Sequence, residues 1–360
     1  MELNSSGLDA AGGAAPPLLA ARSYFSLMAG ARSPDELCLA AERAGYGAIT
    51  LCDAASMYGL PALVDAAAER GLKALAGASF RLPDGRALYV WALDRAGYGR
   101  LCRLTSAARG GDPAKAAEGE ALAGDFAAPD GEALSRRGAP PPEGTRFPLP
   151  PGWAAVRAFN VSAALEGLGL GGLAAATASE PALRRLAALP GAEPSAAGAR
   201  ALANGGRVPA VGVGGLYVAL ESFAPMARAA RLAARLGLRP LAVVAGRVLD
   251  PACDHERLRL LAAVERRVTV SAVEAAGRAG GAAADGLPEP DEPPLPGAAR
   301  AAALYSAYPE AVAAAQELAA AAAPAAAFFS SPPAFPRWRG LPEEEAYRAL
   351  RAACEEGAAR

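Results

Sequence analysis

The chain has 360 residues, with 36 Lys and Arg, 37 Asp and Glu, and a formal net charge of −1. This length suffices for one large domain or for two to three smaller ones, and the near-zero net charge argues against a protein that coats a polyanion. Alanine accounts for 98 residues and lysine only for Lys73 and Lys115, so arginine carries nearly all of the positive charge. The single histidine, His255, excludes any metal centre built from several histidines.

The cysteines and the apolar stretches indicate the compartment. The five cysteines are odd in number and form no CxxC pair, which is typical of thiols in a reducing cytosol; they are Cys38, Cys52, Cys102, Cys253 and Cys354. Residues 1–17 contain acidic residues and no basic start of a secretory signal, so we expect a flexible leader. The Ala-rich stretch 311–327 contains Gln316, Glu317 and Pro324, and alanine is too weakly hydrophobic to anchor it in lipid. We therefore expect a cytoplasmic protein without a membrane contact.

The first hundred residues alternate between short helices and strands. Ser33 can cap a helix, Pro34 suits its first position, Glu36 completes a capping box, and Gly45 ends it. The apolar run 48–52 is typical of a buried parallel strand. The same patterns predict, in chain order, a helix at 61–70, strands at 73–77 and 87–92, and a helix at 97–108. This short-period alternation favours an α/β fold with a parallel sheet.

The second half is less regular. Residues 109–150 are rich in Gly, Pro and charge and are typical of an insertion, and a second low-complexity insert is expected at about 165–210. The predicted elements are a strand at 152–161, a helix at 181–189, a strand at 215–220, a helix at 225–236, a strand at 240–244, and helices at 252–265, 308–322 and 343–356. Five prolines mark a linker before the last two helices. The last helix begins with three glutamates that complement its dipole.

Six segments, in order and spacing, resemble the polymerase-and-histidinol-phosphatase (PHP) domain. They are similar to the version that opens the alpha subunit of bacterial DNA polymerase III and its error-prone relative. The segments are 23–37, 44–53 with 57–60, 71–78, 97–105, 232–241 with 249–251, and 308–311 with 343–357. The resemblance implies a distorted (β/α)7-type barrel with a C-terminal helical joining segment.

The resemblance also implies the domain boundaries. The barrel would span 18–275 after the leader 1–17, and a linker at 276–297 would lead to a helical segment at 298–360. In the family, a polymerase palm follows that segment, and its carboxylates hold the catalytic Mg²⁺ ions. We therefore expect this chain not to polymerise DNA by itself.

The family's metal site is a cluster of histidines and carboxylates at strand ends that activates water for phosphoester hydrolysis. The matching positions here hold Ala20, Arg22, Asp53, Ala54, Ser79, Ala87 and residues 245–248. Only Asp53 keeps a ligand of the family. A methyl group has no lone pair to offer, and Arg22 places a fixed positive charge where a cation would lie. We expect no bound metal, no cofactor and no catalytic residue.

Two residues have a second interpretation. His255 lies outside the family's ligand positions and is expected in the first turn of its helix, as an exposed residue. A metal site shared with Cys253 is disfavoured, because residues two apart on a helix point in different directions. Asp53, at the end of a strand, can instead cap the turn that follows it.

The run 212–215 is glycine-rich, but a strand rather than a helix follows it, which favours a flexible turn over a phosphate loop.

Three arginines are candidates for contacts at the surface. Arg228, Arg231 and Arg235 are spaced i, i+3 and i+7 and share one face of the predicted helix 225–236. Such a face is either solvated or a contact surface for DNA or a protein partner.

Three functions follow from these patterns. The first is a non-catalytic PHP-like module with a structural or subunit-binding role in DNA replication or repair, whose partner is a polymerase body or another replication or repair subunit. The second is a metal-dependent phosphoesterase or 3′–5′ proofreading exonuclease. The third is a DNA-binding accessory protein. The loss of ligand residues favours the first.

Overall fold

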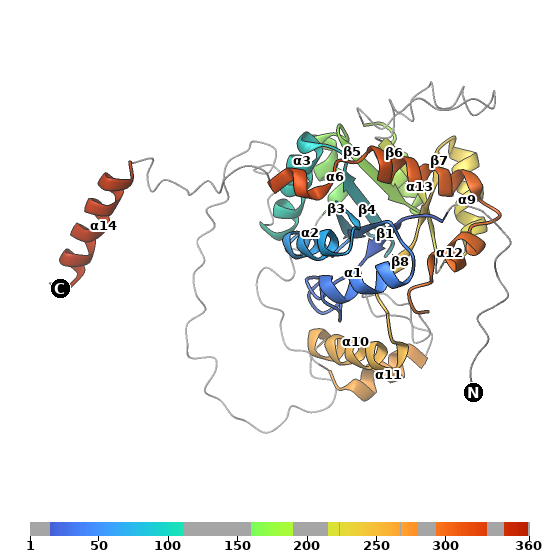
Figure 1. Cartoon of the computed structure of the whole chain (residues 1–360), viewed down its shortest axis with the longest axis horizontal. Helices are drawn as coiled ribbons and strands as arrows, with labels where there is room; N and C mark the ends of the chain where they lie inside the picture. Colours follow the sequence, from blue (N-terminus) through green and yellow to red (C-terminus); the bar gives the residue numbers. More distant parts are fainter. Residues whose placement is uncertain are drawn as a thin grey trace. The chain divides into compact units, whose positions relative to one another are not determined.

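The computed structural model describes residues 15–110, 160–189, 215–222, 224–266, 268–278, 293–329 and 342–358. The chain divides into two units, Met1–Ala325 and Ala326–Arg360. The first unit holds an eight-stranded sheet (Figure 1). Its strands are β1 (Leu18–Ala21), β2 (Ala48–Leu51), β3 (Lys73–Arg81), β4 (Ala87–Ala92), β5 (Leu173–Thr177), β6 (Gly215–Glu221), β7 (Arg239–Val243) and β8 (Ala245–Gly246).

The sheet is nearly closed into a barrel. The strand order is β7-β6-β5-β4-β3-β2-β1-β8, so the two end strands are consecutive in sequence. Backbone bonds of 3.0 Å connect Ala20 N to Val244 O and Arg22 N to Gly246 O, which joins the last strands to the first. The predicted α/β barrel fold is confirmed.

One strand departs from the predicted parallel sheet. β4 runs antiparallel to both β3 and β5, whereas the other neighbouring strands are parallel. Only residues 82–86 connect β3 to β4, and a parallel crossover needs a dozen or more residues. The connection is a tight turn in which Gly85 has a φ of 82° and its N–H donates to Leu82 O. The prediction of a parallel sheet was wrong for β4, because the alternation of helices and strands along the sequence does not by itself give the direction of a strand.

The predicted helices begin and end close to their predicted positions, and with three helices that were not predicted individually, at 161–168, 270–278 and 298–304, they complete the set in the described residues. They are α1 (Pro34–Arg43), α2 (Leu60–Glu69), α3 (Arg95–Gly110), α6 (Val161–Leu168), α7 (Glu180–Leu186), α9 (Met226–Leu236), α10 (Pro251–Arg266), α11 (Val270–Arg278), α12 (Ala298–Leu304), α13 (Pro309–Ala321) and α14 (Glu343–Ala358), with a 3₁₀ helix at Ala325–Phe329. The predicted capping box is present: Glu36 N donates to Ser33 Oγ at 3.1 Å and Ser33 N donates to the Glu36 carboxylate at 2.8 Å.

Two regular segments fall where low complexity was expected. β5 is Leu-Ala-Ala-Ala-Thr, completely buried between β4 and β6, and such alanines carry no strand signal of their own. Asn160 caps α6 by accepting from Ala163 N, so Val161 is helical and not the end of the predicted strand 152–161. The rest of that strand lies outside the described residues, as do most of the insert 109–150 and of the linker 276–297.

The segment after the predicted linker is divided between the two units. α12 starts with Ala298 N donating to Ala44 O at 2.7 Å, and α13 packs on β7. The hydroxyl of fully buried Tyr305 lies 2.6 Å from Leu220 O and 3.1 Å from Val243 O, which ties this segment to β6 and β7. α14 belongs to the second unit.

One helical stretch among the described residues, Pro309–Phe329, is long and apolar enough by composition to span a bilayer. Its α13 part buries an Ala-rich face that includes Leu318 within the barrel unit. A core helix passes the same composition test, so this stretch is weak support for a membrane span.

Candidate functional site at the carboxyl edge of the barrel

Side chains from five strands meet at one edge of the barrel. Arg22, Asp53 and Glu221 lie at or just beyond the carboxyl ends of β1, β2 and β6. Ser79 of β3 and Tyr89 of β4 are directly paired in the antiparallel register. Because the reversed strand β4 begins where β3 ends, its early residues lie at the same edge as the carboxyl ends of the parallel strands.

Asp53 anchors the loop after β1. Its side chain is fully buried and accepts three hydrogen bonds, from Ser23 N at 2.8 Å and from the Ser23 and Ser26 hydroxyls at 2.7 Å each. Burial raises the pKa of Asp53, while these bonds and the charge of Arg22 oppose the rise. The carboxylate therefore holds a neighbouring loop, not the turn after its own strand.

Arg22 lies among the groups of this edge. Its guanidinium is 3.4 Å from Ser79 Oγ, and that hydroxyl donates to Cys52 O at 2.7 Å. Burial raises the pKa values of both Asp53 and Glu221, and the positive charge of Arg22 counteracts that rise in each. Arg22 is therefore an internal cation shared by carboxylates from opposite sides of the barrel.

Tyr89 and Glu221 form the second polar pair. The Tyr89 hydroxyl donates to Glu221 Oε1 at 2.8 Å, and burial raises the pKa of both groups. Below them Trp91 stacks near the Tyr89 ring, with centroids 6.0 Å apart, and its Nε1 donates to Leu19 O at 3.0 Å. The barrel interior beneath the edge is thus filled by aromatic rings.

The loops after β1 and β2 carry backbone strain and exposed rings. Met28 and Ala55 have positive φ values of 62° and 46°, a region that non-glycine residues rarely adopt. Arg109 donates to Ala55 O at 3.0 Å and lies 4.7 Å above the ring of exposed Tyr58. α3 therefore braces the strained loop from the side.

A divalent metal of the kind implied by the resemblance does not fit these residues. Within the described ranges no group of three or more His, Cys, Asp or Glu could hold an ion. Asp53 spends both of its oxygens on Ser23 and Ser26, and Arg22 supplies the positive charge. We derive no metal chemistry at this edge.

The other predicted ligand positions lie at the same edge or just below it. Ala54 forms a bridge with Ser79, and Ala20 pairs with Ala245 of β8. Ala87 lies two residues before Tyr89 and shares its face of β4. His255 lies on α10, outside the set, where its carbonyl accepts from Arg259 Nε.

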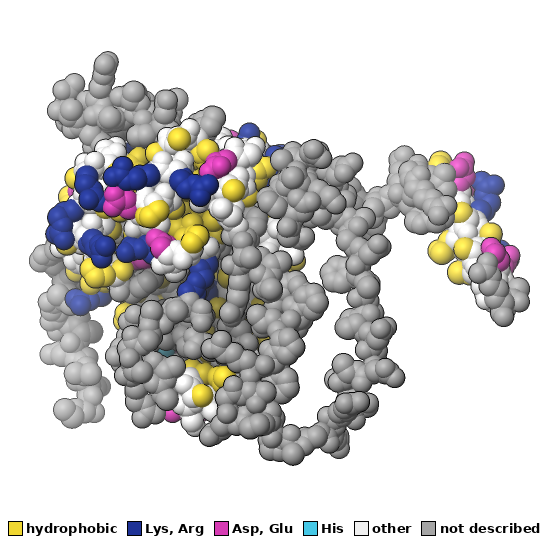
Figure 2. Space-filling model, turned by 180° about the vertical axis from the view of Figure 1, so that it is seen from behind, with side chains coloured by type: hydrophobic (Ala, Val, Ile, Leu, Met, Phe, Trp, Pro, Cys, Tyr) yellow, Lys and Arg dark blue, Asp and Glu magenta, His cyan; other side chains and the backbone are white. Residues whose placement is uncertain are grey.

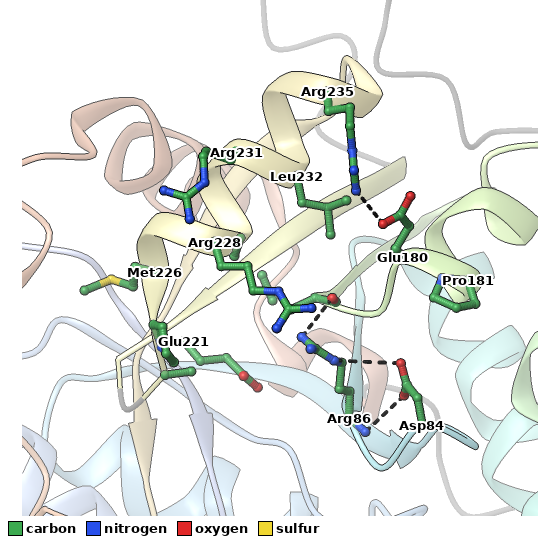
Figure 3. Close-up of a pocket in the computed structure, with 15 residues that line it drawn as sticks. Asp84, Arg86, Glu180, Pro181, Glu221, Met226, Arg228, Arg231, Leu232 and Arg235 are labelled. Carbon is green, nitrogen blue, oxygen red and sulfur yellow. Dashed lines mark hydrogen bonds and ion pairs between the residues drawn. The ribbon is translucent and has the colours of Figure 1, made fainter.

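A groove of about 810 Å³ opens beside Glu221 (Figure 3). Its walls come from the β3–β4 turn, the start of α7, the end of β6 and α9, and the three predicted surface arginines Arg228, Arg231 and Arg235 line it. Arg235 pairs with Glu180, whereas in the described parts of the chain neither Arg228 nor Arg231 forms a side-chain hydrogen bond or ion pair. Figure 2 shows a face where basic side chains gather with acidic ones among them.

Four residues of this edge were missed by the sequence patterns. Ser23 and Ser26 hold Asp53, and Tyr89 and Glu221 form the buried pair. Of these four, only Glu221 could have been found from the sequence, because it is a carboxylate directly after the predicted apolar strand 215–220. The serines and Tyr89 look like ordinary loop and strand residues.

Comparison with known proteins finds similarity over the first part of the chain. The PHP domain family matches residues 19–127. An error-prone DNA polymerase of Methylococcus capsulatus is 41% identical over 91 residues, which are 25% of this chain and 9% of that protein. One from Bordetella parapertussis is 34% identical over 143 residues, 38% of this chain and 13% of that protein. The chain thus spans only about a tenth of the length of the curated relatives it matches.

Two solved structures are more distantly similar. An amidohydrolase from Chromobacterium violaceum with bound sulfate and no metal aligns with a TM-score of 0.31 and 17% identity, over 64% of this chain and 86% of that one. A protein described as a metal-dependent phosphoesterase, from Bifidobacterium adolescentis, aligns with a TM-score of 0.27 and 16% identity, over 63% and 87%.

Proposed function

Because this chain contains a PHP domain, matched over residues 19–127, we propose that it is a non-catalytic module of a DNA polymerase III alpha-type protein. Its role is structural or subunit-binding, in DNA replication or repair. The polymerase context comes from the error-prone polymerases that it resembles over its first part. Their complete activity belongs to chains about ten times longer than the matched segment, and we do not transfer it.

One observation carries the proposal. The cation at the carboxyl edge is the side chain of Arg22, and the one carboxylate in a family ligand position, Asp53, is engaged by Ser23 and Ser26. A guanidinium stays protonated at every physiological pH, so it cannot ligate a metal or accept a proton from water, and it is not a Lewis acid that could lower the pKa of a bound water. The edge therefore combines a fixed cation with a carboxylate that is already engaged, which suits a module that supports another chain.

The enzymatic alternative needs a metal, so metal content tests the proposal. The purified chain is incubated with Zn²⁺ and Mn²⁺, passed through gel filtration and measured by ICP-MS, and hydrolysis of a chromogenic phosphodiester is followed in parallel. We expect much less than one equivalent of metal and no hydrolysis above that of buffer. One or more equivalents of metal, with hydrolysis that Asp53→Asn abolishes, would overturn the proposal.

The subunit-binding part is tested separately. The chain is mixed with the palm-containing body of an error-prone polymerase and analysed by gel filtration. We expect the two to elute together as a complex. Separate elution at concentrations well above the micromolar range would contradict this role while leaving the metal result unaffected.

A further inference from the structure

The groove beside Glu221 contains two arginines whose charge no described residue compensates. Arg228 and Arg231 lie on α9, are exposed, and are spaced i, i+3 on one helix face. In Figure 3, Arg228 points into the groove towards Arg86. Each guanidinium can bind a carboxylate or phosphate in a bidentate manner through two parallel N–H donors, and the two side chains leave the helix one turn apart.

The other charges of the groove are already paired. Glu180 forms ion pairs with Arg235 and Arg184. Arg86 Nε lies 3.8 Å from Asp84 Oδ2, and Arg86 Nη1 donates to Ala178 O at 3.0 Å. Glu221 accepts from Tyr89. The two charged lining residues without a described hydrogen-bond or ion-pair partner are therefore both arginines on α9, Arg228 and Arg231.

The lining favours a polypeptide over a nucleic acid. Asp84 and Glu180 lie on the wall opposite α9, so the lining alternates in charge and offers no unbroken basic track for a phosphate backbone. Among the described lining residues there is no aromatic ring on which a base could stack. Apolar contacts are available instead, from Met226 and Leu232 on α9 and from Pro181.

From this arrangement we propose that the groove docks an acidic, amphipathic segment of a partner protein. Two carboxylates of the segment pair with Arg228 and Arg231. Apolar side chains of the segment contact Met226 at one end of the α9 wall, and Leu232 and Pro181 further along the groove (Figure 3). This inference rests on the proposed subunit-binding function and names the chemistry of the partner. Charge pairs of this kind steer association and set specificity.

The test uses short fluorescent peptides and fluorescence anisotropy at low salt. The acidic probe carries glutamates three and four residues apart with leucine between them, and its counterpart carries lysines at the same positions. We expect saturable binding of the acidic probe only. Arg228→Glu with Arg231→Glu should weaken it by at least about tenfold, equivalent to about 1.4 kcal/mol, and should confer binding of the lysine probe.

A matched control and a second ligand complete the test. Arg103→Glu reverses an exposed arginine on α3, away from the groove, and should leave the affinity unchanged. Arg228→Gln with Arg231→Gln removes the charge without adding repulsion, and circular dichroism checks that each variant is folded.

Three results would overturn the inference. The first is no saturable binding of the acidic probe, and the second is binding that the double variant leaves intact. The third is tighter binding of a fluorescent oligothymidylate that the same two substitutions abolish, which would make the groove a nucleic-acid site. A failure here is distinguishable from a failure of the proposed function, because metal content and co-elution with a polymerase body are measured without these probes.

Discussion

Replacing Asp53 by alanine tests whether this carboxylate anchors a loop or awaits a metal. The substitution leaves the Ser23 N–H and the Ser23 and Ser26 hydroxyls without their acceptor, at a position with no solvent exposure. A buried donor left without a partner costs about 1–3 kcal/mol. The two hydroxyls can partly turn elsewhere, and the cost of burying the carboxylate disappears, so we expect a net loss of about 3 kcal/mol in the free energy of unfolding.

The assay is urea unfolding followed by circular dichroism, in buffer with EDTA. Asp53→Asn keeps the shape but only one acceptor oxygen, and Ser23→Ala removes only the hydroxyl bond while the backbone N–H of residue 23 and the Ser26 hydroxyl still donate, so both should lose less than Asp53→Ala. Asp65→Ala changes an exposed residue of α2 and should lie within about 0.5 kcal/mol of the parent.

If Asp53 were kept as a metal ligand, its substitution by alanine would have the opposite effect on stability. A carboxylate kept for a metal is an uncompensated buried charge in EDTA, so its removal would leave stability unchanged or raise it. If Asp53→Ala unfolds within about 1 kcal/mol of the parent in EDTA, the loop-anchoring role is refuted.

Three further predictions concern packing, the joining segment and pH. Gly59→Ala would place a Cβ 2.8 Å from the Phe25 ring, and we expect a loss of about 1–3 kcal/mol in urea unfolding, against no change for Gly47→Ala, which meets nothing within 4 Å; equal effects would contradict the contact. Tyr305→Phe removes a buried hydroxyl between two carbonyl oxygens and should cost about 1–2 kcal/mol; an unchanged melting temperature would be inconsistent with the tie to the barrel. The hydrogen bond from Ser33 N holds the pKa of Glu36 below its usual 4.5, so the stability it contributes is complete above pH 4.5 and is lost as the pH falls through its lower native pKa. The stability difference between the parent and Glu36→Gln should therefore shrink on acidification, and a difference that grows below pH 4.5 would disprove the sign.

The sequence predicted those elements whose signals are local. The capping box that starts α1 and the glycine that ends α9 fix those helix ends from nearby residues alone, and both are present. β5 was missed because its three central alanines owe their extended form to neighbours on both sides. The direction of β4 was wrong because it depends on the length of a connection.

The candidate site was predictable only where a residue could be placed without knowing its distant neighbours. Asp53 and Arg22 could be placed by resemblance, and the cation among the carboxylates follows from their residue types. The role of Asp53 could not, because the two serine hydroxyls that engage it lie 27 to 30 residues away in sequence. The pair of Tyr89 and Glu221 spans 132 residues, a separation at which no local pattern operates.

The joining of the last strands to the first has a consequence for how the chain folds. Ala20 in β1 pairs with Ala245 in β8, so the first strand finds one of its two neighbours only after more than two hundred further residues have been synthesised. Until then β1 is an open edge, and unpaired edges of a sheet promote association between chains. Contacts this distant in sequence also slow folding, because a long loop must be closed before the contact is gained. Residues 19–127, although they carry the family match, include only β1 to β4 among the strands that the structure describes, and they are not expected to fold as an independent unit.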